Sequence, residues 1–245
     1  MLARLLVPLV SATLATFGTA EAQTCDNGIL KVAIDIGHTK SHQGATSATG
    51  KKEYAFNRRF ALELMERARG RPTLHLILLN AAEAEVTLED RPREAVRHKA
   101  GLFLSIHHDA VNIKYIRKWI YQEREQLYSD AFSGHSLFVW NSGPYAAESL
   151  VAATAIGQEL KGAGFVPTPH HAELIPGESR PWVSKDLGIY AAPFVVLRQA
   201  ILPAVLFEVG VIVNRSEERQ LEDADHRGRI QTAILDALSP MCPAR

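Results

Sequence analysis

The chain has 245 residues, of which 47% are hydrophobic and 22% are charged. This composition is typical of a globular protein and allows a substantial buried core, which excludes a disordered or low-complexity chain. Lys and Arg together number 27, as do Asp and Glu, so the formal net charge is zero. A neutral chain has no field of one sign that would hold a polyanion, which argues against nucleic acid as a partner.

The beginning of the chain has the pattern of an export signal. Arg4 precedes an apolar run that is shorter than the about 20 residues needed to span a bilayer. Small residues at Ala20 and Ala22 match the positions that a signal peptidase reads. We therefore expect residues 1–22 to be a cleaved signal peptide and residues 23–245 to be an exported domain, periplasmic or secreted, with no membrane span. A buried N-terminal helix is the alternative.

Two cysteines, Cys25 and Cys242, are too few for a disulfide-rich scaffold or for a four-cysteine zinc site. An exported protein folds in an oxidising compartment, so we predict that these two residues form a disulfide near the two ends of the mature chain. Two free thiols are the alternative. The ten histidines are the more promising place to look for chemistry.

Short apolar runs, rich in β-branched and aromatic residues, alternate along the chain with amphipathic segments. The runs predict buried strands over Leu30–Ile36, Leu74–Leu79, Leu102–Ile106, Ser136–Trp140 and Ala204–Val209. The amphipathic segments predict helices around Phe56–Leu64, Glu148–Gly162 and Arg227–Leu238. This alternation predicts a single α/β domain with a mostly parallel twisted sheet and helices on both faces. The chain has no internal repeat or Ser/Gly-rich linker that would divide it.

Residues with metal-binding side chains gather where such a sheet binds ligands, beyond the carboxyl ends of its strands. His38 follows the first predicted strand, and His107 and His108 follow the third. Glu208 lies within the last predicted strand, and Glu53 opens the first predicted helix. Two imidazoles and a carboxylate suit zinc with an open fourth position. A further carboxylate can act there as general base, and burying one unpaired costs several kcal/mol, which favours a role for it.

Five motifs follow one another along the chain at Ile34–His38, Gly50–Glu53, Leu88–Arg91, Phe103–Asp109 and Pro203–Asn214. In their order and spacing they resemble the zinc-dependent N-acetylmuramoyl-L-alanine amidases, the cell-wall amidases of the AmiA/AmiC and LytC kind. The resemblance covers roughly residues 31–238. It implies one zinc ion per chain, bound at the carboxyl ends of the strands by His38, Glu53 and His107, with Glu208 as the catalytic general base.

The resemblance also implies a reaction, the hydrolysis of the amide between N-acetylmuramic acid and the L-alanine of the peptidoglycan stem peptide. Zinc would polarise the carbonyl and lower the pKa of its water toward about 7, while Glu208 would pass a proton to the leaving amine. A zinc peptidase of related fold and a non-catalytic cell-wall-binding domain stay open as alternatives. A protein activator also stays open, and we expect a monomer because a compact neutral domain has no coiled-coil pattern.

The chain departs from the family's usual motifs at two places. The first motif usually reads Asp-Pro-Gly-His-Gly-Gly, whereas residues 35–40 read Asp-Ile-Gly-His-Thr-Lys, and Ala usually stands where this chain has His108. Neighbouring strand residues point to opposite faces, so we expect only one of the pair to bind the metal. The resemblance assigns His107 as the ligand and places His108 beside the substrate or behind the ligands, with the reverse assignment as the alternative. We also expect His170 and His171, in a Pro-rich loop, to contact the stem peptide.

Lys114–Leu127 is a segment that the family pattern does not lead us to expect. Its spacing predicts an amphipathic helix after the third strand. One hypothesis is a flap beside the metal site, with Trp119, Tyr115 or Tyr121 shaping the substrate groove. The alternative is an additional packing helix.

Two other polar residues have predicted structural roles. We expect Arg91 to form a salt bridge and Asp35 to support the loop that carries His38. Structural or solvated positions are expected for His75, His98, His135 and His226.

Overall fold

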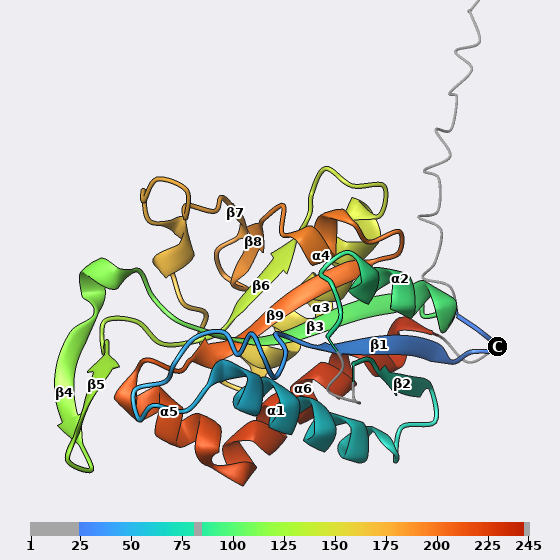
Figure 1. Ribbon diagram of the computed structural model, residues 1–245. Coiled ribbons are helices and arrows are strands. Elements are labelled where there is room, and N and C mark those ends of the chain that lie inside the picture. The colour runs from blue at the N-terminus through green and yellow to red at the C-terminus, as the bar shows by residue number, and fades with distance from the viewer. Residues whose placement is uncertain (1–24, 81–84, 243–245) are drawn as a thin grey trace, which may run out of the picture.

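The computed structural model describes residues 25–80 and 85–242. The predicted signal peptide lies outside these residues. A seven-stranded sheet in the order β2-β1-β3-β9-β6-β8-β7 forms the centre of the molecule (Figure 1). Its strands are β1 (Leu30–Ile36), β2 (Leu74–Leu78), β3 (Leu102–Asp109), β6 (Ser136–Val139), β7 (Trp182–Ser184), β8 (Ile189–Ala191) and β9 (Ala204–Val211).

One half of the sheet is parallel and the other half is mixed. Strands β2, β1, β3 and β9 run parallel, whereas β6 pairs antiparallel with β9 and parallel with β8, and β7 pairs antiparallel with β8. The predicted mostly parallel sheet is therefore confirmed, as are its five predicted strands. The carboxyl ends of β1, β3 and β9 meet at one edge of the molecule (Figure 1).

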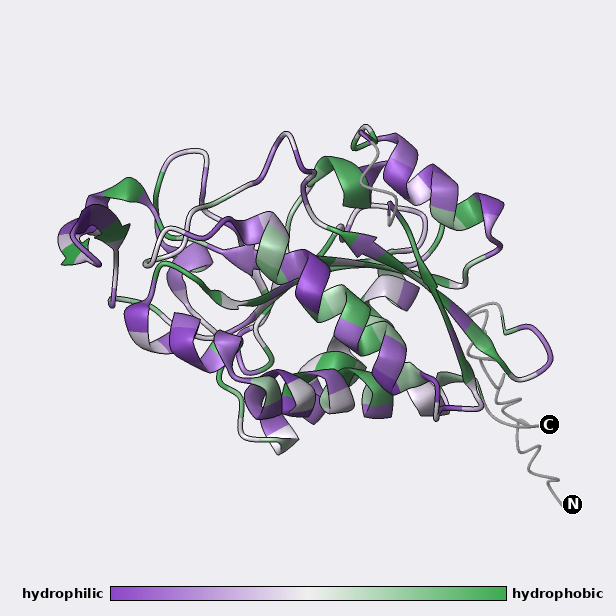
Figure 2. Cartoon of the chain, turned by 60° about the horizontal axis from the view of Figure 1, so that its bottom comes forward, coloured by the Kyte–Doolittle hydropathy of each residue, from purple (hydrophilic) through white to green (hydrophobic). Residues whose placement is uncertain are grey.

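Side chains along the strands alternate between two buried clusters, one on each face of the sheet. Val32 and Ile34 belong to the larger cluster, while Ala33 between them belongs to the smaller. A strand points successive side chains to opposite faces, so near-continuous apolar runs are needed when both faces are covered. Hydrophobic and hydrophilic residues alternate along the helices, as expected for elements with one buried and one exposed side (Figure 2).

Helices cover both faces of the sheet, as predicted. Residues of α1 (Glu53–Ala68), α3 (Ala146–Gly162) and α6 (Ala224–Leu238) form the larger cluster. Residues of α2 (Asp90–Arg97) and α4 (Val195–Arg198) belong to the opposite face. The remaining helices are α5, Arg215–Glu222, and three short 3-10 helices at Ile113–Tyr115, His170–Ala172 and Ser239–Met241. Among the described residues, none of the helices combines the length and apolar character needed to cross a membrane.

The prediction of an amphipathic helix over Lys114–Leu127 is wrong, because the segment forms a hairpin. Strands β4 (Arg117–Tyr121) and β5 (Arg124–Tyr128) pair antiparallel, separate from the main sheet. Gln122 and Glu123 connect them with φ angles of 48° and 63°. A two-residue turn with positive φ at both positions matches the twist of paired strands and favours a hairpin.

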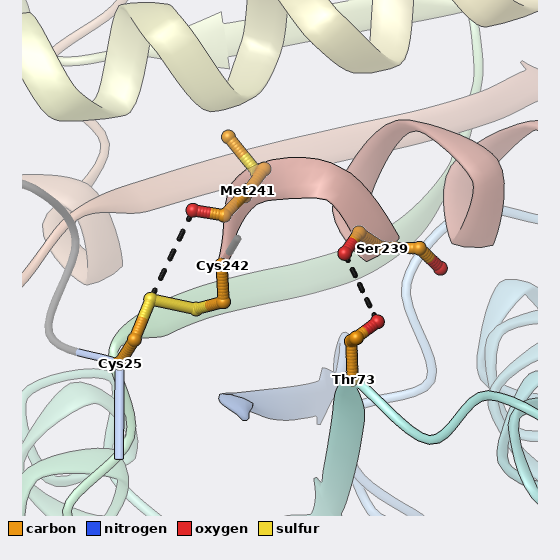
Figure 3. Close-up of a disulfide and its surroundings, with 5 residues drawn as sticks. All are labelled: Cys25, Thr73, Ser239, Met241 and Cys242. Carbon is orange, nitrogen blue, oxygen red and sulfur yellow. Dashed lines mark hydrogen bonds between the residues drawn. A yellow bond between two sulfur atoms is a disulfide. The ribbon is translucent and has the colours of Figure 1, made fainter. Parts of the chain in front are cut away.

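A disulfide joins Cys25 to Cys242, whose Cα atoms lie 5.8 Å apart (Figure 3). The predicted pairing is thereby confirmed. Beside it, the Thr73 hydroxyl donates a 2.9 Å hydrogen bond to the carbonyl oxygen of Ser239. The two ends of the described chain are therefore fastened together at the edge of the sheet that carries the amino end of β1 (Figure 1).

Candidate active site

Strand pairing brings three of the predicted site residues to one edge of the sheet. His38 lies two residues beyond the end of β1, and the preceding Gly37 donates its N–H to the carbonyl of Ile106 at 2.9 Å. In the neighbouring pair of strands, His107 of β3 stands opposite Glu208 of β9. Parallel strands end at a common edge, so side chains far apart in sequence converge there.

Glu53, the first residue of α1, lies between the two histidines. Its carboxylate is 2.8 Å from Nε2 of His38 and 2.9 Å from Nδ1 of His107. The donor atoms of all three side chains lie within 4.8 Å of one another. Burial by itself would raise the pKa of Glu53, but hydrogen bonds and charge from His107 and His38 hold it below its ordinary value. The carboxylate is therefore ionised and ready to bind a cation.

This donor set fits a zinc ion. Zinc prefers imidazole nitrogens and carboxylate oxygens, which stand about 2.0–2.2 Å from the ion. Three such atoms within 4.8 Å of one another can surround one ion and leave a fourth position open. The residues that would hold the ion are the predicted ones, His38, Glu53 and His107.

Two glycines provide the space in which these side chains meet. A Cβ at Gly37 would overlap the imidazole of His107. A Cβ at Gly44, where φ is +71°, would overlap both the Glu53 carboxylate and the ring of His38. His38 itself has a φ of 69°, a left-handed conformation that is uncommon for a residue with a side chain and occurs at functional sites.

A buried ion pair supports the loop that carries His38. Arg91 donates to Asp35 at 2.9 Å, and the same guanidinium donates to the carbonyl oxygens of Ile36 and His38 at 2.6 and 2.7 Å. Ser105 donates to the other oxygen of Asp35 at 2.7 Å. The predicted salt bridge of Arg91 is confirmed, and Asp35 supports the loop through Arg91 rather than by contacting the imidazole.

Glu208 differs from Glu53 in having no polar partner for part of its carboxylate. Its Oε2 is buried without a hydrogen bond. Burial raises the pKa of Glu208 well above its ordinary value, and the nearby charges of Asp109 and Glu53 raise it further. A carboxyl group that takes up a proton readily is suited to proton transfer, and such groups gather at catalytic sites.

An open cleft of about 460 Å³ contains these groups. Its lining includes His38, Glu53, His107 and Glu208. The predicted substrate contacts His170 and His171 also line it, together with Asp109. Asn112 and Ile113, which precede the hairpin β4–β5, also line the cleft.

His108 packs against α1. Its ring contacts Phe56 and Phe60 with centroid distances of 5.5 and 6.1 Å, and its Nδ1 lies 2.7 Å from Oδ1 of Asn57. The residue is 1% exposed, and burial lowers its pKa to about 3, so the ring is neutral. It also belongs to the lining of the cleft, and its role stays a prediction.

Sequence reasoning missed two residues of the site. Asn57 donates to the carbonyl of Gly37 at 3.1 Å and to Glu53 at 3.2 Å, so it ties the start of α1 to the His38 loop. The sequence pattern that could have identified Asn57 is a polar residue one turn after Glu53 on the buried face of α1. The other is Asp109, which contacts His170 and His171 and stands at the end of the motif Phe103–Asp109.

Comparisons with known proteins agree with this arrangement. A model of the Amidase_3 family, N-acetylmuramoyl-L-alanine amidase, matches residues 32–240. The probable cell wall amidase LytH of Staphylococcus epidermidis is 25% identical over 209 residues, covering 84% of this chain and 56% of that protein. Its counterpart in Staphylococcus aureus is 26% identical with the same coverage. The chain thus spans about half the length of the curated relatives it matches.

Solved structures share the fold. The catalytic domain of CwlV, an N-acetylmuramoyl-L-alanine amidase from Bacillus (Paenibacillus) polymyxa var. colistinus, has a TM-score of 0.64 at 26% identity and covers 86% of this chain and 96% of that one. The amidase Ami1 from Mycobacterium smegmatis has a TM-score of 0.69 at 14% identity, covering 90% and 100%. Because the family model matches most of the sequence, the chain belongs to the Amidase_3 family of N-acetylmuramoyl-L-alanine amidases.

Proposed function

We propose that this chain hydrolyses the amide bond between N-acetylmuramic acid and the L-alanine of the peptidoglycan stem peptide. One observation carries the proposal. Two histidines, the ionised Glu53 and the partly unpaired Glu208 converge in one open cleft of a chain that belongs to an amidase family. Peptidoglycan or its soluble fragments are the proposed substrates.

In this proposal His38, Glu53 and His107 hold one zinc ion. The ion would supply a Lewis acid for the amide carbonyl and an activated water at neutral pH. Glu208, from the neighbouring strand, would accept the proton of the attacking water and deliver it to the nitrogen of the departing L-alanine. Its raised pKa makes Glu208 a stronger base than an exposed carboxylate, which favours acceptance of the proton.

Around these groups the chain would hold the reactants in place. Asn57 and the Arg91–Asp35 pair would fix the angle at which Glu53 and His38 face the cleft. His170 and His171, which line the same cleft, are proposed contacts of the stem peptide. His108 would hold Asn57 in its orientation.

Mass spectrometry of peptidoglycan digested by the purified protein with zinc tests the reaction. We expect free stem peptides with a new L-alanine amino terminus, and their loss when Glu208→Gln is used instead. Cleavage within the stem peptide would contradict the proposal and favour a zinc peptidase. The same digestion is repeated with added periplasmic or cell-wall protein fractions as a source of activator. Binding to sacculi without cleavage under both conditions would favour a binding domain.

We further propose that the protein is exported and acts as a monomer. A peptidoglycan substrate lies outside the cytoplasm, and the disulfide fits an oxidising compartment. Intact-mass analysis of the protein recovered from its host should show a chain that begins at Gln23. A mature chain that retains residues 1–22 would contradict the proposed cleavage.

A further inference from the structure

A second group of metal-binding side chains lies in the same cleft, separate from His38, Glu53 and His107. Asp109, at the end of β3, has its Oδ2 2.7 Å from Nε2 of His171 and 3.3 Å from Nε2 of His170. The ligand atoms of the three residues lie within 4.8 Å of one another. The two imidazole rings stand side by side with centroids 3.9 Å apart, so both edges face one carboxylate oxygen.

One of these nitrogens is buried without a hydrogen bond. His170 is 7% exposed, and its Nε2 makes no hydrogen bond although Oδ2 of Asp109 lies 3.3 Å away. A buried polar atom left unpaired costs about 1–3 kcal/mol, so its presence calls for an explanation. A cation between His170 and Asp109 would satisfy it.

The surroundings of His170 prepare this nitrogen for binding. The hydroxyl of the fully buried Thr168 lies 2.8 Å from Nδ1 of His170. When Nδ1 carries the proton and donates to that hydroxyl, Nε2 keeps its lone pair for a ligand. The position of Thr168 is fixed in turn by the Tyr190 hydroxyl, which donates to its carbonyl oxygen at 2.6 Å.

We propose that Asp109, His170 and His171 form a second binding site for a divalent cation of the zinc class. Two imidazole nitrogens and one carboxylate oxygen are the donor set that zinc prefers, and three protein ligands leave a position for water or a ligand oxygen. The other oxygen of Asp109 accepts from the N–H of Ala110 at 2.8 Å, which fixes the plane of the carboxylate. The predicted contact of the two histidines with substrate would then be made through the ion.

The second site would change the charge around Glu208. The charges of Asp109 and Glu53 both act on Glu208, so the two carboxylates lie near it. A cation at Asp109 would offset one of these negative charges. The inference is independent of the proposed amidase reaction, because it concerns which side chains bind a metal.

Metal stoichiometry after equilibrium dialysis against buffered zinc tests the proposal. We expect two zinc ions per wild-type chain, one per chain in His171→Gln and one per chain in His107→Ala. The double variant should bind none. His98→Ala is the matched control, because the His98 ring pairs with Glu94 on the exposed surface and its loss should leave two ions bound.

Asp109→Asn provides an independent variant, because it keeps the size of the side chain and removes the charged ligand. Circular dichroism before dialysis identifies any variant that fails to fold. If one of the two variants fails, the zinc content of the other tests the second site. One ion in the wild type, retained in both His171→Gln and Asp109→Asn, would overturn the second site. Amidase activity that survives the loss of the ion at His107 would contradict the proposed function instead, so the two failures are distinguishable.

Discussion

At the scale of single residues, the candidate metal site requires a residue without a side chain at position 44. Gly44 has a φ of +71°, and a Cβ there would overlap Glu53 and His38. We expect Gly44→Ala to reduce zinc affinity about 10–100-fold, as changes to groups that orient metal ligands typically do. Gly70→Ala is the matched control, because nothing lies within 4 Å of its Cβ position. Isothermal titration with zinc measures both, and equal affinities would contradict this account.

His135 should make the stability of the protein depend on pH. It is 3% exposed, and burial lowers its pKa to about 4, below the ordinary value of about 6.5. The unfolded chain therefore binds one proton more between these pH values, and stability falls as the pH decreases through this range. At pH 5 the loss from this residue is about 2 kcal/mol. No such loss is expected above pH 6.5.

Chemical denaturation of the wild type and His135→Leu at pH 7.5 and pH 5 measures this contribution. The free energy of unfolding should fall less between the two pH values in the variant, by about 2 kcal/mol. Comparing the two proteins removes the contribution of the other titrating groups. Equal pH dependence in both would show that His135 does not titrate in this way.

The sequence allows prediction of those site residues that stand at the ends of strands. His38, His107 and Glu208 could be identified because the register of parallel strands brings such ends together. Asp109 could not, because its partners His170 and His171 reach it from a loop whose path no local pattern encodes. The alternation of strand side chains predicts only that one of the two adjacent histidines binds the metal, and the choice of His107 rests on the family resemblance.

At the scale of elements, the hairpin β4–β5 rests on the loop that leads to α1. Trp119 donates its indole N–H to the carbonyl of Ala48 at 2.8 Å, and the guanidinium of Arg215 lies 5.1 Å from its ring. We expect Trp119→Ala to lower the free energy of unfolding by about 2 kcal/mol, the sum of a hydrogen bond and a cation–π contact. Ile120→Ala, on the exposed face, should change it by less than about 0.5 kcal/mol.

Urea denaturation measures the change in unfolding free energy for Trp119→Ala and for Ile120→Ala. Equal effects of the two substitutions would contradict the packing of Trp119. The flap hypothesis stays a prediction, and turnover of Trp119→Ala on muropeptides, measured where the variant is fully folded, bears on it directly.

Strands buried on both faces could be predicted because their apolar runs are nearly continuous. The hairpin could not, since its turn residues Gln122 and Glu123 adopt positive φ without the Gly or Asn that usually signals this turn. Strands β7 and β8 have only three residues each, which is too short for a periodic pattern. Sequence periodicity therefore identifies long elements and misses short ones that tertiary pairing creates.

At the scale of the whole molecule, one covalent bond joins the two ends of the described chain. The cysteines are separated by 217 residues, so their disulfide restricts the unfolded chain strongly. Chain-entropy arguments give an upper bound of about 5 kcal/mol for its contribution to stability. We expect the double variant Cys25→Ala and Cys242→Ala to lose about 2–5 kcal/mol of unfolding free energy.

The same double variant should keep its zinc stoichiometry under conditions where it is folded, because the disulfide lies at the opposite end of β1 from His38 (Figure 1). Thermal unfolding with and without a reductant provides a second measurement, in which only the wild type should respond to the reductant. A wild type as stable reduced as oxidised would contradict the role assigned to the disulfide.

The order of the whole sheet explains why one short cleft contains residues from so many parts of the sequence. β1, β3 and β9 are adjacent although the chain visits α1, β2 and the hairpin between them. Their carboxyl ends form a common edge, and α1 begins at that edge with Glu53. The general position of the site is therefore a property of the topology, while its chemistry depends on individual side chains.

Glu208 is proposed to transfer protons beside a metal held by His38, Glu53 and His107. The most direct measurement is turnover of a defined muramoyl peptide by Glu208→Gln, with zinc content determined on the same sample. We predict unchanged zinc content and a fall in kcat/KM of about 10²–10⁴-fold, the usual effect of losing a general acid–base group. Full activity with zinc bound would contradict the role of Glu208.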